Sequence, residues 1–209
     1  MARLLPLFPL QLVALPGNPL PLHIFEPRYR EMVGAAALNG SEFGIVLAKG
    51  EGIVNAGCTV VVESITERYE DGRFDILARG RRRFNIVSVN DDEECLRAEP
   101  DFFDDEDARP AAPEYRTRAM RACLELHAGL NDDTPAPAAD LTDPELSFRL
   151  APTVRDLDFL DAILRERSET RRLELIIEVA PRYLERVQYV RKMKQVVPTN
   201  GNGHKPKGI

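Results

Sequence analysis

Residues 59–79, with the sequence TVVVESITERYEDGRFDILAR, hold two β-rich runs, 59–66 and 74–79, on either side of Asp71-Gly72. Asp-Gly supplies the positive φ angles that a tight hairpin turn requires. The flanking runs are rich in the β-branched and aromatic residues that are typical of strands. The stretch therefore predicts an antiparallel β-hairpin.

Further β-rich runs lie on both sides of this hairpin, within the first hundred residues. They are 4–8, 20–24, 43–48, 84–89 and, as a weaker last member, 96–99. Together with the hairpin they predict an antiparallel sheet or barrel. One helix is expected to interrupt the sheet at about 27–38, because Pro27 suits a first helical turn and Asn39-Gly40 suits a helix end.

An acidic, proline-bearing segment at 101–113 separates this region from one in which apolar residues recur at helical spacing. Helices are expected at 114–130, from a capping box at Thr142 and Glu145 to about Leu150, at 157–164 and at 173–180. Pro181 should end or kink the last of these helices, although the apolar face continues beyond it. We therefore predict an α+β chain with four parts. They are a β-rich subdomain at 1–100, an acidic linker at 101–113, a helical bundle at 114–196 and a disordered tail at 197–209.

The composition narrows the classes of function. The 209 residues include 34 acidic and 28 basic ones, and the formal net charge of -6 disfavours nucleic acid as a partner. No apolar run approaches the roughly 18 residues of a membrane helix, and the N-terminus lacks the pattern of a secretion signal, so we expect a cytoplasmic location and no membrane partner. Cys58, Cys95 and Cys123 form no C-x-x-C pair, which indicates neither a disulfide framework nor a thiolate metal site.

No catalytic, cofactor or metal site is predicted. The phosphate-binding pattern G-x-x-x-x-G-K-[ST] is absent, and His23, His127 and His204 stand without clustered ligands. Cys58 lies beside a valine-rich run with no histidine near it in sequence, so a buried thiol is preferred to a nucleophile.

Two features invite a binding role. Basic residues cluster at 79–83, but alternate strand residues face opposite ways, so pairing with Glu63, Glu67 or Glu70 is preferred to a nucleic-acid surface. Phe102 and Phe103 lie among acidic residues at the end of the last strand. In an extended chain one ring would anchor the linker and the other would face outward as a contact for an apolar peptide. The alternative is that both rings close the gap between the two halves.

Several motifs together suggest a family. They are LPLFPL at 5–10, LPG at 15–17, LPLHIFEPRY at 20–29, GCTVV at 57–61, YEDGRFDIL at 69–77 and GRRRFNI at 80–86. These motifs resemble the N-terminal, substrate-binding domain of the Lon protease family. FEPRY, followed by Met32 and Val33, is especially similar to free-standing bacterial members, which lack the ATPase and peptidase domains. The helical half resembles the family more loosely, through RLELIIE at 172–178.

The resemblance implies a PUA-like β pseudo-barrel followed by a helical bundle. It also implies a non-catalytic module that binds unfolded or exposed polypeptide as an adaptor or holdase, and it allows a separate ATP-dependent protease as a partner. Phe102 and Phe103 are the candidate contacts for such a polypeptide. Two alternatives stay open at this point. An RNA-binding PUA-like module would need a contiguous positive patch, and a small hydrolase would need a pocket that collects a base, a nucleophile and oxyanion donors.

Overall fold

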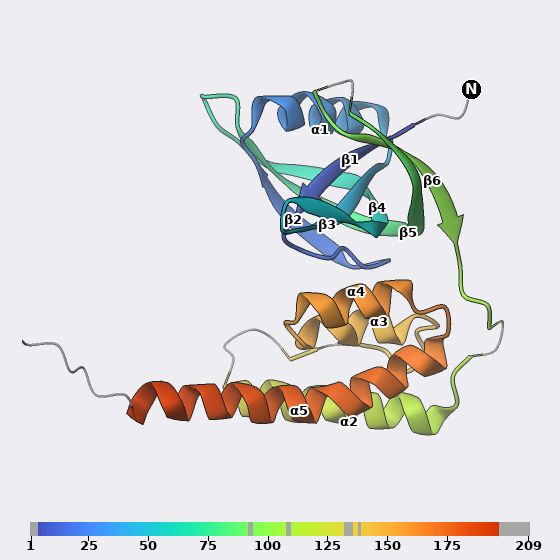
Figure 1. Ribbon diagram of the computed structural model, residues 1–209, viewed down its shortest axis with the longest axis vertical. Helices are drawn as coiled ribbons and strands as arrows, with labels where there is room; N and C mark the ends of the chain where they lie inside the picture. The colour runs from blue at the N-terminus through green and yellow to red at the C-terminus, as the bar shows by residue number, and fades with distance from the viewer. Residues whose placement is uncertain (1–3, 92–93, 108–109, 132–135, 138, 197–209) are drawn as a thin grey trace, which may run out of the picture.

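A computed structural model describes residues 4–91, 94–107, 110–131, 136–137 and 139–196 (Figure 1). The tail expected at 197–209 lies outside the described residues. The chain forms a β-barrel with one helix across its end, followed by a layer of short helices and then a pair of long helices. The α+β fold class is confirmed.

The barrel is built from a single six-stranded sheet in the order β2-β5-β4-β3-β1-β6, which closes because β5 also pairs with β6. Its strands are β1 (Leu5–Leu10), β2 (Pro19–Ile24), β3 (Phe43–Lys49), β4 (Gly52–Arg68), β5 (Phe74–Asn90) and β6 (Arg97–Phe103). The pairings are antiparallel except that of β1 with β3, which is parallel. The runs expected at 74–79 and 84–89 are two parts of the single strand β5, and β6 extends into the segment expected as linker.

The predicted hairpin joins β4 to β5. Gly72 has φ 85°, and the Tyr69 amide donates to the Arg73 carbonyl at 2.9 Å. The β3–β4 turn contains Gly50 at φ 61°, whereas Gly52, the first residue of β4, has no positive φ. The hairpin prediction is confirmed, and Gly50 shares with Gly72 a conformation that favours glycine.

Replacing Gly72 by alanine is expected to lower the free energy of unfolding by about 1 to 2 kcal/mol, because an L-residue is strained in the left-handed region. Gly52→Ala is the matched control, since the added Cβ would meet nothing within 4 Å. Urea unfolding of both variants measures the difference. Equal losses at the two positions would contradict a conformational role for Gly72.

The helices are α1 (Pro27–Asn39), α2 (Pro113–Leu130), α3 (Leu146–Leu150), a 3-10 turn η1 (Ala151–Thr153), α4 (Leu157–Arg165) and α5 (Glu169–Val196). Pro27 begins α1, and Gly40, at φ 62°, caps its end as expected. The predicted capping box is wrong, because α3 begins at Leu146 with no side-chain cap, and Asp143 instead accepts the Glu145 amide. Of the two outcomes expected at Pro181, an end or a kink, the helix end does not occur, because α5 continues through this residue.

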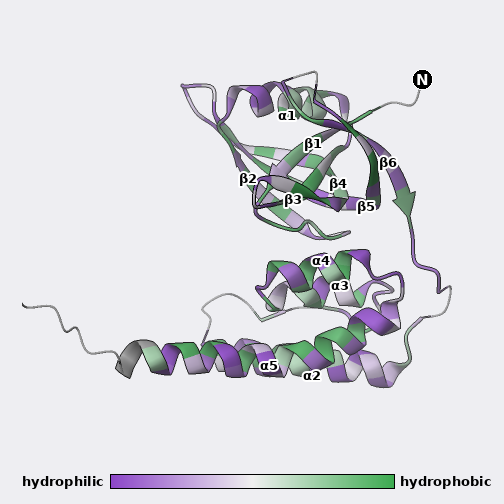
Figure 2. Ribbon diagram, in the orientation of Figure 1, coloured by the Kyte–Doolittle hydropathy of each residue, from purple (hydrophilic) through white to green (hydrophobic). Residues whose placement is uncertain are grey.

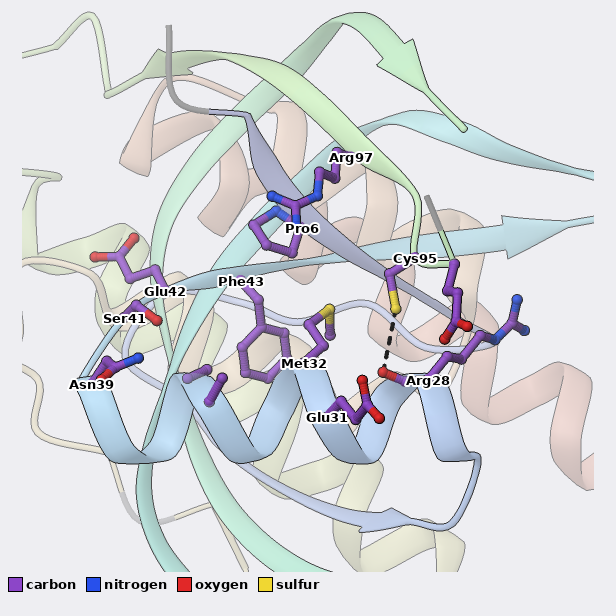
Figure 3. A pocket seen from close by; sticks show the side chains of 13 residues that line it. Pro6, Arg28, Glu31, Met32, Asn39, Ser41, Glu42, Phe43, Cys95 and Arg97 are labelled. Carbon is purple, nitrogen blue, oxygen red and sulfur yellow. Dashed lines mark hydrogen bonds between the residues drawn. The ribbon is translucent and has the colours of Figure 1, made fainter. Parts of the chain in front are cut away.

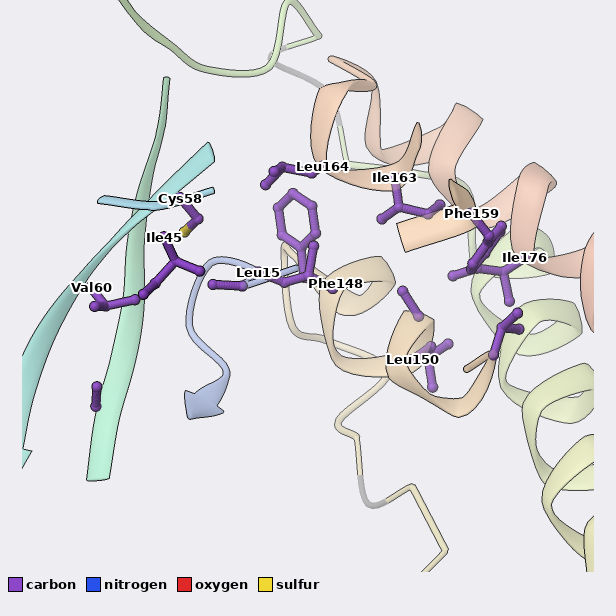
Figure 4. Packing of buried hydrophobic residues seen from close by; sticks show 14 of the residues in the cluster. Leu15, Ile45, Cys58, Val60, Phe148, Leu150, Phe159, Ile163, Leu164 and Ile176 are labelled. Atoms are coloured by element: carbon purple, nitrogen blue, oxygen red, sulfur yellow. The ribbon is translucent and has the colours of Figure 1, made fainter. Parts of the chain in front are cut away.

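One hydrophobic cluster runs from the barrel into the helices. Leu15, Ile45 and Cys58 lie on the barrel side, and Phe148 and Leu164 face them from α3 and α4 (Figure 4). Hydrophobic residues are correspondingly spread over both the strands and the helices (Figure 2). The contact between the two halves is therefore a packed core.

Polar contacts fix α3 to the turn that precedes β2. The Arg149 guanidinium donates to the Pro16 carbonyl at 2.6 Å and to the Asn18 side chain at 2.9 Å, while the Asn18 amide donates to the Phe148 carbonyl at 2.6 Å. Gly17, at φ 69°, lets the guanidinium lie directly against the backbone. This turn, residues 15–18, is one joint between the halves.

A buried ion cluster forms a second joint. Arg83 of β5 and Arg172 of α5 both donate to Asp105 at 2.6 Å, and Arg172 also donates to Glu169 at 2.9 Å and to the Ser147 hydroxyl at 2.7 Å. Two arginines therefore face two carboxylates. Burial raises the pKa of Glu169, although hydrogen bonds from Ser147 and the charge of Arg172 oppose the rise.

Candidate functional site

A groove made of two adjoining hollows crosses the barrel between α1 and β6. We call them the α1 hollow, of about 630 Å³, and the β6 hollow, of about 450 Å³. The two hollows share Pro6, Ser41, Glu42 and Arg97, which makes the groove continuous. Each volume lies in the range of 300–1,000 Å³ that is typical of ligand sites.

The α1 hollow has an apolar floor (Figure 3). Met32 of α1 and the buried ring of Phe43 lie at its centre, with Pro6 of β1 on the opposite side from the helix. Met32 is only partly buried, so its flexible thioether side chain is available to adapt to an apolar group. At the start of the helix, Arg28 forms an ion pair with Glu26 at 2.9 Å.

The β6 hollow has an aromatic wall. The Phe102 ring is 40% exposed, and the Arg82 guanidinium lies over it at 3.9 Å from the ring centre. Glu42 holds that guanidinium with two hydrogen bonds of 3.0 and 3.1 Å, and the Phe84 ring meets Phe102 edge-on at 6.3 Å. Phe102 is therefore a fixed ring with part of its surface open to solvent.

The two predicted binding residues separate to opposite faces of β6. Phe103 is 9% exposed and lies near the guanidinium groups of Arg83 and Arg167, where it belongs to the joint with the helices. Phe102 lines the groove. The structure thus brings one of the pair to the candidate site and places the other in the interior.

Sequence reasoning missed the remaining wall of the groove. Met32 lies beside the buried face of α1 formed by Tyr29, Val33 and Ala36, at the edge where the core opens into the α1 hollow. Arg97 carried no signal at all, since a single arginine at the start of a strand is usually a solvated residue. The groove depends on contacts between β1, α1 and β6 that no local pattern reveals.

The environment of the groove does not favour thiol chemistry. Cys95 lines the α1 hollow, but burial raises the pKa of its thiol, which keeps it in the less reactive protonated form. Burial also raises the pKa values of Cys58 and Cys123 to about 12. Within the described residues, no three His, Cys, Asp or Glu side chains gather to hold a metal ion.

None of the helices in the described part of the chain is long and apolar enough to cross a membrane.

The model of one protein family, the ATP-dependent protease La (LON) substrate-binding domain, matches residues 4–194. The chain belongs to this Lon family. A crystal structure of a Lon N-terminal domain protein from Xanthomonas campestris is 27% identical and superposes with a TM-score of 0.66, covering 84% of this chain and 98% of that one. The N-terminal domain of the Mycobacterium avium complex Lon protease, at 16% identity and a TM-score of 0.53, covers 86% of this chain and 98% of its own and shares the fold.

The match confirms the resemblance drawn from the motifs of the barrel and extends it to the helical half, through most of α5. It also identifies the chain as a substrate-recognition domain of the Lon family. The part of Lon that it resembles is the substrate-binding part, as the family's description states.

Proposed function

We propose that this Lon-family domain binds unfolded or exposed apolar segments of other polypeptides in the groove, as an adaptor or holdase. The observation that carries the proposal is the continuous groove, with an apolar floor at Met32 and Phe43 and the open ring of Phe102 at its far end. Exposed apolar surface of this kind marks sites of protein interaction. We further propose a separate ATP-dependent protease as the acceptor of the bound client, on the strength of the family membership alone.

The rim of the groove suits a mixed peptide. Arg28, Arg82 and Arg97 line it together with Glu31, Glu42 and Glu94. Arg82 is already neutralised by Glu42 and Arg28 by Glu26. With charges this balanced, affinity should come chiefly from apolar contacts and from the peptide backbone rather than from client charge.

The basic run at 79–83 supports this reading over RNA binding. Arg79 pairs with Glu63, as expected, whereas Arg82 pairs with Glu42 and Arg83 with the buried Asp105. Three of its arginines are thus directed to three separate acidic partners. These pairings disfavour the contiguous positive patch that RNA binding would require.

Replacing Phe102 by alanine is expected to weaken binding to an unfolded model protein about tenfold, because aromatic anchors dominate such contacts. Stability should change little, since the ring is 40% exposed. Fluorescence anisotropy with labelled, reduced and carboxymethylated α-lactalbumin measures the affinity, and thermal unfolding measures the stability.

The matched control is Phe25→Ala, which removes an aromatic ring that is 57% exposed and does not line the groove. It should leave the affinity unchanged. Equal losses for both variants would indicate general surface stickiness, and no loss for Phe102→Ala would place the binding site elsewhere.

A further inference from the structure

Among the residues that the structure describes, the edge of β6 that borders the β6 hollow is only partly paired. β1 pairs with β6 at Pro6↔Arg97 and Leu5↔Ala98. From Glu99 to Phe103, the pairings of β6 within the described residues are all with β5. Pro100 and Phe102, which lie on this stretch, line the β6 hollow. A strand edge therefore opens directly into the groove.

The direction of the backbone groups on this edge follows from one hydrogen bond. The Leu7 amide donates to the Leu96 carbonyl at 2.8 Å, so the carbonyl of Leu96 points toward β1. Backbone groups of a strand alternate between its two sides. Ala98, Pro100 and Phe102 hence direct their groups to the β1 side, and the intervening residues direct theirs to β5.

This edge offers a small number of backbone groups for hydrogen bonding to an added strand. Pro100 contributes a carbonyl and no amide, as suits an edge position. Phe102 contributes both an amide and a carbonyl. An extended chain running antiparallel to β6, as β1 does, would meet these groups in register beyond Leu4, the first described residue, which itself lines the β6 hollow.

We propose that the client binds by strand addition: an extended polypeptide pairs with the Pro100–Phe102 edge of β6 and places alternate side chains in the groove. The strand-addition proposal rests on the proposed function and adds the geometry by which the client binds. Main-chain hydrogen bonds would supply affinity that is independent of client sequence, and the hollows would select apolar side chains at every second position. Such a mode suits a receptor for unfolded chains, whose backbone is unpaired.

A second edge of the sheet, that of β2, is poorly suited to the same role. β2 pairs only with β5 within the described residues, and its prolines Pro19 and Pro21 both lack an amide. They lie two residues apart and therefore on the same side of the strand. Prolines at such positions discourage added strands.

Two substitutions of one residue test the proposal. Phe102→Ala and Phe102→Pro both remove the ring, but only the proline variant also removes the edge amide. We expect Phe102→Pro to bind carboxymethylated α-lactalbumin about tenfold more weakly than Phe102→Ala, with similar circular dichroism spectra. Equal affinities that are both weaker than that of the parent would overturn strand addition and leave the groove in place. Parent-like binding by both variants would contradict the groove itself.

Amide hydrogen exchange on the unaltered protein provides a readout that does not depend on the variants folding. We expect the Phe102 amide to exchange freely without client and to become at least tenfold slower with saturating α-lactalbumin. The same measurement on a chain lacking residues 1–3 tests whether the chain's own N-terminus occupies this edge instead of a client. If the Phe102 amide is protected without client and loses that protection in the shortened chain, the edge belongs to the chain's own N-terminus and the proposal is overturned.

Discussion

Asp105→Ala is expected to lower the free energy of unfolding by about 3 kcal/mol, near the lower end of the range for breaking a buried ion pair. The substitution leaves Arg83, 5% exposed, and Arg172, 0% exposed, facing each other without the carboxylate between them. The Asp105 side chain is itself 25% exposed, so water will compensate in part. Urea unfolding followed by circular dichroism measures the loss.

Glu106→Ala is the control, because its ion pair with Arg167 is exposed and should contribute less than about 1 kcal/mol. A loss at Asp105 no larger than this would show that the cluster does not hold the two halves together.

The Asp105 effect should depend on pH. Burial raises the pKa of this carboxyl, but the hydrogen bond from Arg172 and the charges of both arginines outweigh burial and lower it. A lowered pKa stabilises the fold above the unfolded value of about 3.9, and this contribution is lost as the pH falls through the folded value. The difference in free energy of unfolding between the parent and Asp105→Ala should therefore be constant above about pH 5 and become smaller below about pH 4.

Gly80→Ala is expected to cost about 3 kcal/mol for a different reason, overpacking. A Cβ added there would lie 2.0 Å from the Leu15 carbonyl oxygen, and that backbone is held by hydrogen bonds from Gly80 to Asn18 and from Gly17 to Gly80. The turn must shift, which loosens Leu15 from the core and Arg149 from the turn.

Gly34→Ala is a control that should raise the free energy of unfolding rather than lower it. It lies within α1, and its added Cβ would meet nothing within 4 Å. Alanine has the better helix propensity, so this variant should be more stable by up to about 1 kcal/mol. Thermal unfolding of the two variants under one condition suffices, and a neutral Gly80→Ala would show that the turn can move without loss.

The local elements could be predicted because their signals are local. Asp71-Gly72 specified the hairpin, and Pro27 and Gly40 marked the two ends of α1. The capping-box prediction failed although Thr142 and Glu145 have the right spacing. The backbone amides of these two residues donate instead to the carboxylates of Asp140 and Asp143. Side-chain competition of that kind is invisible in spacing.

The candidate site could be predicted only in part. Alternation along an extended strand correctly separates Phe102 from Phe103. Two long-range features could not be predicted: the pairing of β1 with β3 and the ion cluster of Arg83, Asp105 and Arg172. Each joins residues that are far apart in the chain, and no periodic pattern in the sequence indicates the contact. The groove lies where such long-range contacts meet.

The joint at residues 15–18 also has a consequence for how the protein is made on the ribosome. Asn18 and the Phe148 carbonyl that it binds are 130 positions apart in the chain. At a synthesis rate of about 5–20 residues per second, the turn waits on the order of ten seconds for its helical partner to be translated. During that interval Leu15 and Ile45 cannot pack against Phe148, which belongs to the same core (Figure 4). A nascent barrel of this family would itself present exposed apolar surface, and in that interval it would be a client for chaperones.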